Sequence, residues 1–397
     1  MSLYELPQEI VSLIVWYLDK PSLVAVLRTA HFLRPHAEHL LYHKVDLHTG
    51  PMSQTRTINF LIRVVRNPRV GSLVSFFYPE LVNYHIALSS TGEFVDLLPY
   101  AMRFLPNLKT LALRQADEIP KCLRWHPNQD PPFQLERLAL RFVLIQDLPK
   151  CGRDVLRLLQ KQPSLRHLCL GLPSYMQWGD HSPMPDAERS DVMKLFPSLE
   201  ILEGTNSVVR LLFSKRRVKS LLWECDRPYR EPFRLPRELE TDSHLRNGFF
   251  TPELCKAYSH LEHLVIHEQI SLLPILSTFL KSLKTLLLSV GVPIDDEGSD
   301  NADGSPLLRA IVEMGNLEAL AITLTGESSI RLHHYTVFAA APKLKHFAFL
   351  VGGRGQVLQM PVFMERGTDG TIYPVAREVI FDIPYLHKGW FTFGTEF

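Results

Sequence analysis

Apolar residues near the start of the chain recur at helical spacing. Leu6 and Pro7 are predicted to begin a helix, since proline at the first helical position has no hydrogen bond to lose. Ile10, Ile14 and Leu18 follow at four-residue steps and form one apolar stripe along that helix. The pattern therefore predicts an amphipathic helix in the first twenty residues.

Two further short helices are predicted directly after the first. A polar break at residues 19–22 ends the first helix, and Ser22 is predicted to cap the second, which carries Leu23 and Leu27. The third helix covers residues 36–43. Three helices this short expose more apolar surface than they can bury among themselves. We therefore expect a small helical unit that needs a partner surface.

From residue 105 onward a second pattern, Leu-x-x-Leu-x-Leu, repeats along the chain. Clear copies begin at Leu108, Leu135, Leu165, Leu261, Leu283, Leu317 and Leu344, and weaker copies begin at Leu199 and Val218. The last two leucines of each copy lie two positions apart and therefore share one face of a short strand. One repeat alone buries its leucines only in part, so neighbouring repeats must stack. We predict an α/β fold with a curved, mostly parallel sheet and outer helices.

Apolar residues at helical spacing between the copies predict the outer helices. Their expected positions are residues 154–162, 187–196, 252–259, 272–280, 307–314 and 333–341. Residues 55–67 and 94–104 are predicted as helices, residues 70–77 as a strand and residues 375–383 as a last strand. The aromatic segment 389–397 is expected to cap the end of the stack.

Composition and charge argue against several classes of protein function. The chain has 397 residues with 43 basic and 42 acidic side chains, so bulk charge does not favour a nucleic-acid or membrane-surface role. The five cysteines form no C-x-x-C pair, which argues against a disulfide framework or a zinc module. No signal-type N-terminus or long apolar window occurs. We therefore expect the protein to be located in the cytoplasm, the nucleus or both.

The candidate chemical motifs are incomplete. The acidic stretch 295–303 lacks the alternating ligands of a calcium loop. His36, His39 and His43 have helical spacing but no acidic or cysteine partner for zinc. Residues 352–355 are glycine-rich but lack the ending of a phosphate loop. The sequence therefore predicts no catalytic residue, no metal site, no cofactor and no enzymatic activity.

The N-terminal pattern resembles an F-box. The matching positions are Leu6, Pro7, Glu9, Ile10, Ile14, Tyr17, Leu18, Asp19, Ser22, Leu23, Leu27, residues 40–42 and residues 45–47. The chain departs from the common pattern at Ala30 and His31, where many members have a Cys-Arg pair. The resemblance implies that this region docks on the Skp-type adaptor of a cullin ubiquitin ligase. The adaptor-binding residues would be Leu6, Pro7, Ile10, Ile14, Leu18, Leu23 and Leu27.

The repeats resemble an irregular leucine-rich-repeat solenoid of the kind that F-box proteins often carry. The asparagine or cysteine that common repeats place after the third leucine is missing, so we expect a less regular stack. The predicted domains are an F-box at 1–48, linking helices and a first solenoid segment at 49–104, and a substrate-binding solenoid at 105–397. The resemblance implies a substrate-recognition subunit that binds a protein substrate through the repeats.

Two hypotheses about function remain open. For a third, that the chain is an enzyme, the sequence provides only negative evidence. The strand face turned away from the leucines is the expected substrate surface. Its candidate residues are Arg114, Arg141, His167, His263 and His267. In the alternative, the chain is an interaction scaffold outside any ubiquitin ligase, and the N-terminal helices cap the repeats. A cap would bury Ile10, Ile14 and Leu18, whereas a docking module would leave them exposed.

Overall fold

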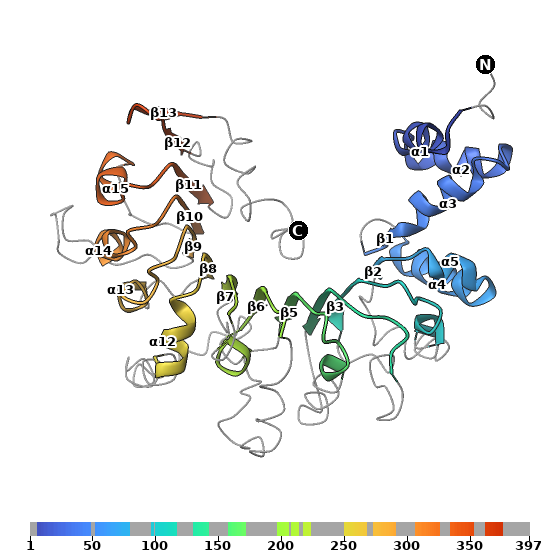
Figure 1. The fold of residues 1–397 in the computed structure, drawn as a ribbon, viewed down its shortest axis with the longest axis horizontal. Helices are drawn as coiled ribbons and strands as arrows, with labels where there is room; N and C mark the ends of the chain where they lie inside the picture. Colours follow the sequence, from blue (N-terminus) through green and yellow to red (C-terminus); the bar gives the residue numbers. More distant parts are fainter. Residues whose placement is uncertain are drawn as a thin grey trace, which may run out of the picture. The chain divides into compact units, whose positions relative to one another are not determined.

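The structure is a computed structural model that places two compact units along the chain (Figure 1). Unit 1 comprises residues 1–169 and 194–198, and unit 2 comprises residues 170–193 and 199–397. The described residues are 6–48, 52–79, 97–98, 100–116, 130–142, 158–171, 197–205, 208–213, 217–223, 250–267, 273–290, 306–325, 334–352 and 362–375. The predicted domain limits at residues 48 and 104 stay predictions.

The strands follow one another in chain order, which confirms the predicted α/β fold with a mostly parallel, open sheet. The first strands are β1 (Lys44–Asp46), β2 (Phe76–Tyr78), β3 (Thr110–Ala116), β4 (Arg137–Phe142) and β5 (His167–Gly171). Unit 2 holds β6 (Ile201–Gly204), β7 (Ser220–Trp223), β8 (His263–His267), β9 (Thr285–Val290), β10 (Ala319–Thr325), β11 (His346–Gly352), β12 (Val362–Arg366) and β13 (Ile372–Pro374). Among the described strands, antiparallel pairing occurs where β12 pairs with β11 and with β13.

Helices connect the strands. Unit 1 has α1 (Gln8–Trp16), α2 (Lys20–Thr29), α3 (Arg34–His43), α4 (Ser53–Arg66) and α5 (Pro68–Ser72). Unit 2 has the π-helical turn η3 (Val209–Phe213), α12 (Pro252–Tyr258), α13 (Leu273–Leu276), α14 (Pro306–Glu313) and α15 (His334–Ala340). Helices α12 to α15 lie along one side of strands β8 to β11 (Figure 1). The last four predicted outer helices are therefore present, although α13 is shorter than expected.

The repeat leucines form the core between strands and helices. Leu264, Leu286 and Leu320 occupy equivalent, paired positions on neighbouring strands and are essentially inaccessible to solvent. Aromatic side chains complete this layer, as where the ring of Phe338 on α15 meets the ring of Phe347 on β11 edge-on. Each strand thus contributes one apolar row that only its neighbours and its helix can cover.

One backbone carbonyl per repeat joins each strand to the next. The carbonyl of Lys109 accepts the N–H groups of Glu136 and Arg137 at 2.8 and 2.9 Å, and that of Glu136 accepts those of the next repeat. The same arrangement recurs in unit 2 at Glu200, Lys219, Glu262, Lys284 and Glu318, whereas the Lys345 carbonyl accepts the N–H of Arg366 from the antiparallel β12. Because this carbonyl ladder sits at the strand starts, the register there is regular despite the missing asparagines. The irregularity that we expected appears later, as a register shift near the ends of β3 and β4.

The side chains at these ladder positions alternate in charge. The nine residues are Lys109, Glu136, Arg166, Glu200, Lys219, Glu262, Lys284, Glu318 and Lys345. Ion pairs join Lys109 to Glu136 at 2.9 Å, and Lys284 to Glu262 at 2.6 Å. The hydrogen bond from Lys284 lowers the pKa of the Glu262 carboxyl. Each exposed ion pair stabilises the fold by only about 0–1 kcal/mol. However, a strand that paired one repeat out of order would place side chains of the same charge next to each other.

Two predictions about local structure need correction. Residues 70–77 were expected as a strand, but Val70 lies in α5 and only the last of these residues reach β2. Val70 and Val74 are both buried, at the four-residue spacing of a helical turn. Ser22 does not cap α2: the carboxylate of Asp19 caps it, by accepting the Ser22 N–H at 3.0 Å.

The end of unit 2 also differs from expectation, because the sequence did not predict the hairpin of β12 and β13. The guanidinium of Arg366 on β12 lies over the ring of Phe338 at 5.1 Å and donates to the Phe338 and Pro342 carbonyls at the C-terminal end of α15. A cation at that helix end is favourable. The strand predicted at 375–383 and the aromatic cap at 389–397 lie outside the described residues, except for Val375.

The first prediction concerns a buried side chain that ties two repeats together. The Gln162 side chain is buried, accepts the Leu135 N–H at 2.6 Å and donates to the Phe133 carbonyl at 3.5 Å. Gln162→Leu leaves both backbone groups buried without this partner. We expect the free energy of unfolding to fall by about 2 kcal/mol in urea denaturation.

The matched control is Gln134→Leu on the facing turn. Gln134 is exposed and donates to the Lys161 carbonyl at 3.4 Å. Its replacement should change the free energy of unfolding by less than about 0.5 kcal/mol. Equal losses for the two variants would contradict the role given to Gln162.

Candidate partner-docking surface

Helix α1 has apolar side chains on two faces. Val11 and Val15 point inward and are buried, and Val15 packs with Leu23 of α2 and Ala37 of α3. Of the residues on the other face, Ile10 is 43% exposed and Ile14 is 41% exposed. A helix that is apolar all round is normally buried all round. The outer face of α1 therefore has the character of a contact surface.

The outer face of α1 extends beyond the predicted residues Ile10 and Ile14. Leu13 is 52%, Trp16 69% and Tyr17 81% exposed, and Val24 on α2 is also exposed. Ile10, Leu13, Ile14 and Tyr17 follow the three- and four-residue spacing of one helical stripe. We call these four residues the α1 outer stripe. Tyrosine and tryptophan are over-represented among residues that dominate binding energy at interfaces.

The seven predicted adaptor-binding residues divide into two groups. Leu6 is half-buried, and Pro7, Ile10 and Ile14 are exposed. Leu23 is buried, and Leu18 and Leu27 are half-buried around the same small interior between α1, α2 and α3. In the described fold, this second group therefore mainly holds the three helices together.

Polar contacts tie helix α3 to the helices that follow it. The Glu38 carboxylate is buried and pairs with Arg34 on its own helix and with Arg69 of α5, both at 3.0 Å. The guanidinium of Arg63 on α4 lies over the ring of Tyr42 at 5.1 Å. Removing one partner from a buried charge pair is costly. These contacts hold α3 against the helices that precede β2.

The backbone provides a second tie. The carbonyl of His43, the last residue of α3, accepts the N–H of Ser75 at 3.0 Å. The carbonyl of Ser75 in turn accepts the N–H groups of Lys109 and Thr110, each at 2.9 Å. The carbonyl ladder of the repeats therefore begins at the end of α3. The three N-terminal helices and β1 to β4 belong to one hydrogen-bonded framework.

The predicted substrate-binding residues lie on strands. His167 is on β5 and His263 on β8, and both side chains are buried, with His263 only 8% exposed. Burial lowers the pKa of each imidazole to about 4. Arg114, Arg141 and His267 are on β3, β4 and β8, but their side chains lie outside the described part of the structure.

In unit 2, the strand face that was predicted to bind the substrate carries a central row of apolar side chains. A second buried cluster gathers there on neighbouring strands, apart from the row of repeat leucines: Leu222, Val265, Leu287, Ala319, Ala321, Ala348 and Phe363. Val375 packs against this cluster. The repeat phase placed Val265 and Leu287 on the outward face but did not predict their burial, and Phe363 lies on β12, which the sequence did not predict. In the described residues this face is therefore a second packed layer rather than an open polar groove.

The described residues contain no group of three or more histidine, cysteine or acidic side chains arranged to hold a metal ion. Among the same residues, no helix has the length and apolar character needed to cross a membrane. The acidic stretch 295–303 lies outside them. His36, His39 and His43 are on α3, where Ser12 lies 3.0 Å from His36 and the rings of His39 and His43 are 5.1 Å apart.

Comparison with known proteins adds no family assignment: no protein-family model and no curated protein matches the chain. Functional inference therefore rests on the sequence pattern and on the geometry described above.

The buried histidines predict a loss of stability in acid. Their pKa lies below the ordinary value of 6.5, so protonation favours the unfolded state as the pH falls from 6.5 toward 4. Each of His167 and His263 should lower the free energy of unfolding by about 2 kcal/mol between pH 7 and pH 5. Urea denaturation at both pH values measures this.

Replacement of single histidines separates their contributions. His263→Gln and His167→Gln should each weaken the dependence of stability on pH. His260→Gln, at an exposed position, is the control and should keep the dependence of the unmodified protein. The interpretation is wrong if all three variants retain the same acid-induced loss.

Proposed function

We propose that the chain is a substrate-recognition subunit of a Skp–cullin–F-box ubiquitin ligase. Its N-terminal helices, which resemble an F-box, would bind the Skp-type adaptor. The strand repeats, which resemble leucine-rich repeats, would bind a protein substrate. The observation that carries the proposal is the exposed α1 outer stripe on a helix whose opposite face is already packed.

The exposure of α1 favours docking over capping. A cap that closes the repeat stack would bury Ile10 and Ile14 against the first strands. Both are more than 40% exposed, and α1 packs instead on α2 and α3 through Val11 and Val15. Exposed apolar patches on folded domains are characteristic of protein interaction sites.

The contacts between α3 and the strands support a receptor that binds the adaptor through its N-terminal helices and the substrate through its strands. A ligase subunit must hold its substrate at a defined position relative to the adaptor. The buried Glu38 pairs and the His43–Ser75 hydrogen bond restrict movement of the N-terminal helices relative to β1 to β4. A flexible linker at this point would allow many orientations instead.

The adaptor contact is tested by placing charge on the α1 outer stripe. Ile10→Asp with Ile14→Asp inserts two carboxylates into the proposed apolar contact, which are costly to bury without partners. We expect affinity for a purified Skp-type adaptor to fall by about 100-fold, measured by calorimetry. Because both side chains are exposed, the double variant should keep the thermal stability of the unmodified protein.

The control is Val312→Asp on α14, an exposed apolar position in the other unit. It should leave affinity for the adaptor unchanged. No binding by the unmodified protein, or full binding by the double variant, would refute the proposal. Affinity purification with the proteasome blocked then distinguishes a ligase from a scaffold: a ligase subunit recovers a cullin and a ubiquitylated protein, whereas a scaffold recovers neither.

A further inference from the structure

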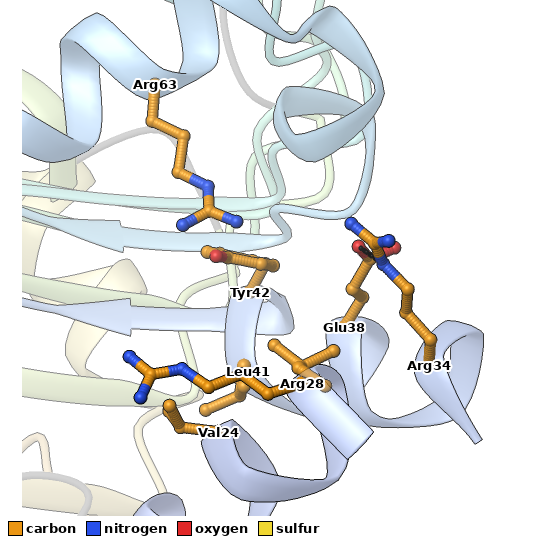
Figure 2. A pocket seen from close by; sticks show the side chains of 8 residues that line it. Val24, Arg28, Arg34, Glu38, Leu41, Tyr42 and Arg63 are labelled. Atoms are coloured by element: carbon orange, nitrogen blue, oxygen red, sulfur yellow. Dashed lines mark hydrogen bonds and ion pairs between the residues drawn. The ribbon is translucent and has the colours of Figure 1, made fainter. Parts of the chain in front are cut away.

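A cavity of about 340 Å³ lies between α2, α3 and α4, apart from the α1 outer stripe. We call it the α2–α4 pocket. Figure 2 shows its lining: Val24, Leu27, Arg28, Arg34, Glu38, Leu41, Tyr42 and Arg63. The sequence did not reveal this site, because its residues come from three helices and form no local motif.

The charge around the pocket is positive after internal pairing. Arg34 is bound to Glu38, whose other oxygen binds Arg69. Arg28 and Arg63 have no carboxylate partner among the residues that the structure describes. In Figure 2 the guanidinium of Arg63 lies over the Tyr42 ring, and Arg28 extends on the opposite side of Tyr42. Two guanidinium groups therefore remain to bind an anion.

The remaining lining is apolar, with one hydroxyl group. Leu27 and Leu41 are half-buried, and Val24 is exposed. The ring of Tyr42 forms part of the wall, and burial raises the pKa of its hydroxyl, so this group stays a neutral hydrogen-bond donor at pH 7. An anion alone would leave the leucine and valine surface in contact with water. The lining therefore favours a ligand with both a negative group and an aliphatic group.

We propose that the α2–α4 pocket binds a peptide segment of a protein partner in which an acidic residue lies next to an aliphatic residue. Because Arg28 and Arg63 lie on opposite sides of Tyr42, one carboxylate of the segment would pair with Arg28 and another with Arg63. Arginine favours two-pronged contacts with carboxylates. The aliphatic side chain would cover Leu27 and Leu41. Nucleic acid fits less well, since two arginines do not make a basic stripe. This proposal does not depend on the proposed ligase function.

The test is fluorescence anisotropy of the full chain with a fluorescein-labelled peptide of alternating glutamate and leucine. We expect saturable binding that weakens as salt rises. Arg28→Gln and Arg63→Gln should each weaken binding about ten-fold, the effect of losing a charge-assisted hydrogen bond. Arg66→Gln, an exposed arginine on α4 outside the lining, is the control and should bind like the unmodified protein.

Two altered peptides test the dual chemistry of the ligand. Glutamine in place of glutamate, or serine in place of leucine, should each weaken binding. Retention of full affinity by the serine peptide, or an equal loss in Arg66→Gln, would reduce the site to general anion attraction and overturn the proposal. Absence of saturable binding up to about 1 mM peptide would also overturn it.

Further controls separate this site from misfolding and from the adaptor surface. Arg28 is exposed and makes no ion pair within the described residues, so Arg28→Gln should keep the thermal stability of the unmodified protein. Ile10→Asp with Ile14→Asp should keep peptide binding, because neither residue lines the pocket. Loss of peptide binding in that double variant would refute a separate site.

Discussion

The fold depends on a constraint that acts once per repeat: a strand with one apolar row cannot bury that row alone. The repeat leucines need a neighbour on each side, and the carbonyl ladder fixes where that neighbour lies. Hydrophobic contact is not directional, so leucines by themselves would tolerate a slipped strand. Two features fix how each strand aligns with its neighbour: one carbonyl binds two N–H groups of the next strand, and the side chains at that position alternate in charge. Together they favour a single register.

The same constraint explains how the N-terminal helices are held. His43 and Ser75 occupy ladder positions although neither lies in a leucine motif. The stack of parallel strands thus begins at β1, directly after α3, and not at the first leucine repeat. The buried Glu38, with Arg34 and Arg69, reinforces that junction from the side. A surface presented on α1 is consequently connected to β1 to β4 through ordered elements.

Sequence patterns predicted the features that are local. Leu-x-x-Leu-x-Leu located the strands of the clear repeats, because spacing by two residues determines which side chains share a face. It did not locate β1 or β2, where residues such as Val45 and Phe77 take the place of leucines. From Ile10 to Leu18 every position except Ser12 is apolar, so periodicity could not distinguish the inward Val11 and Val15 from the outward stripe. The burial of His263 depends on distant parts of the chain and had no local signal.

The two candidate contact surfaces of unit 1 differ in the physics of recognition. The α1 outer stripe offers apolar area without charge, so binding there would be driven by desolvation and would depend little on salt. The α2–α4 pocket offers two guanidinium groups beside a small apolar floor, so binding there would weaken with salt and select for sequence. A partner that used only one surface would show one of these salt dependences. A partner that spans both would combine them, and the shared framework around α3 would make the two contacts mutually reinforcing.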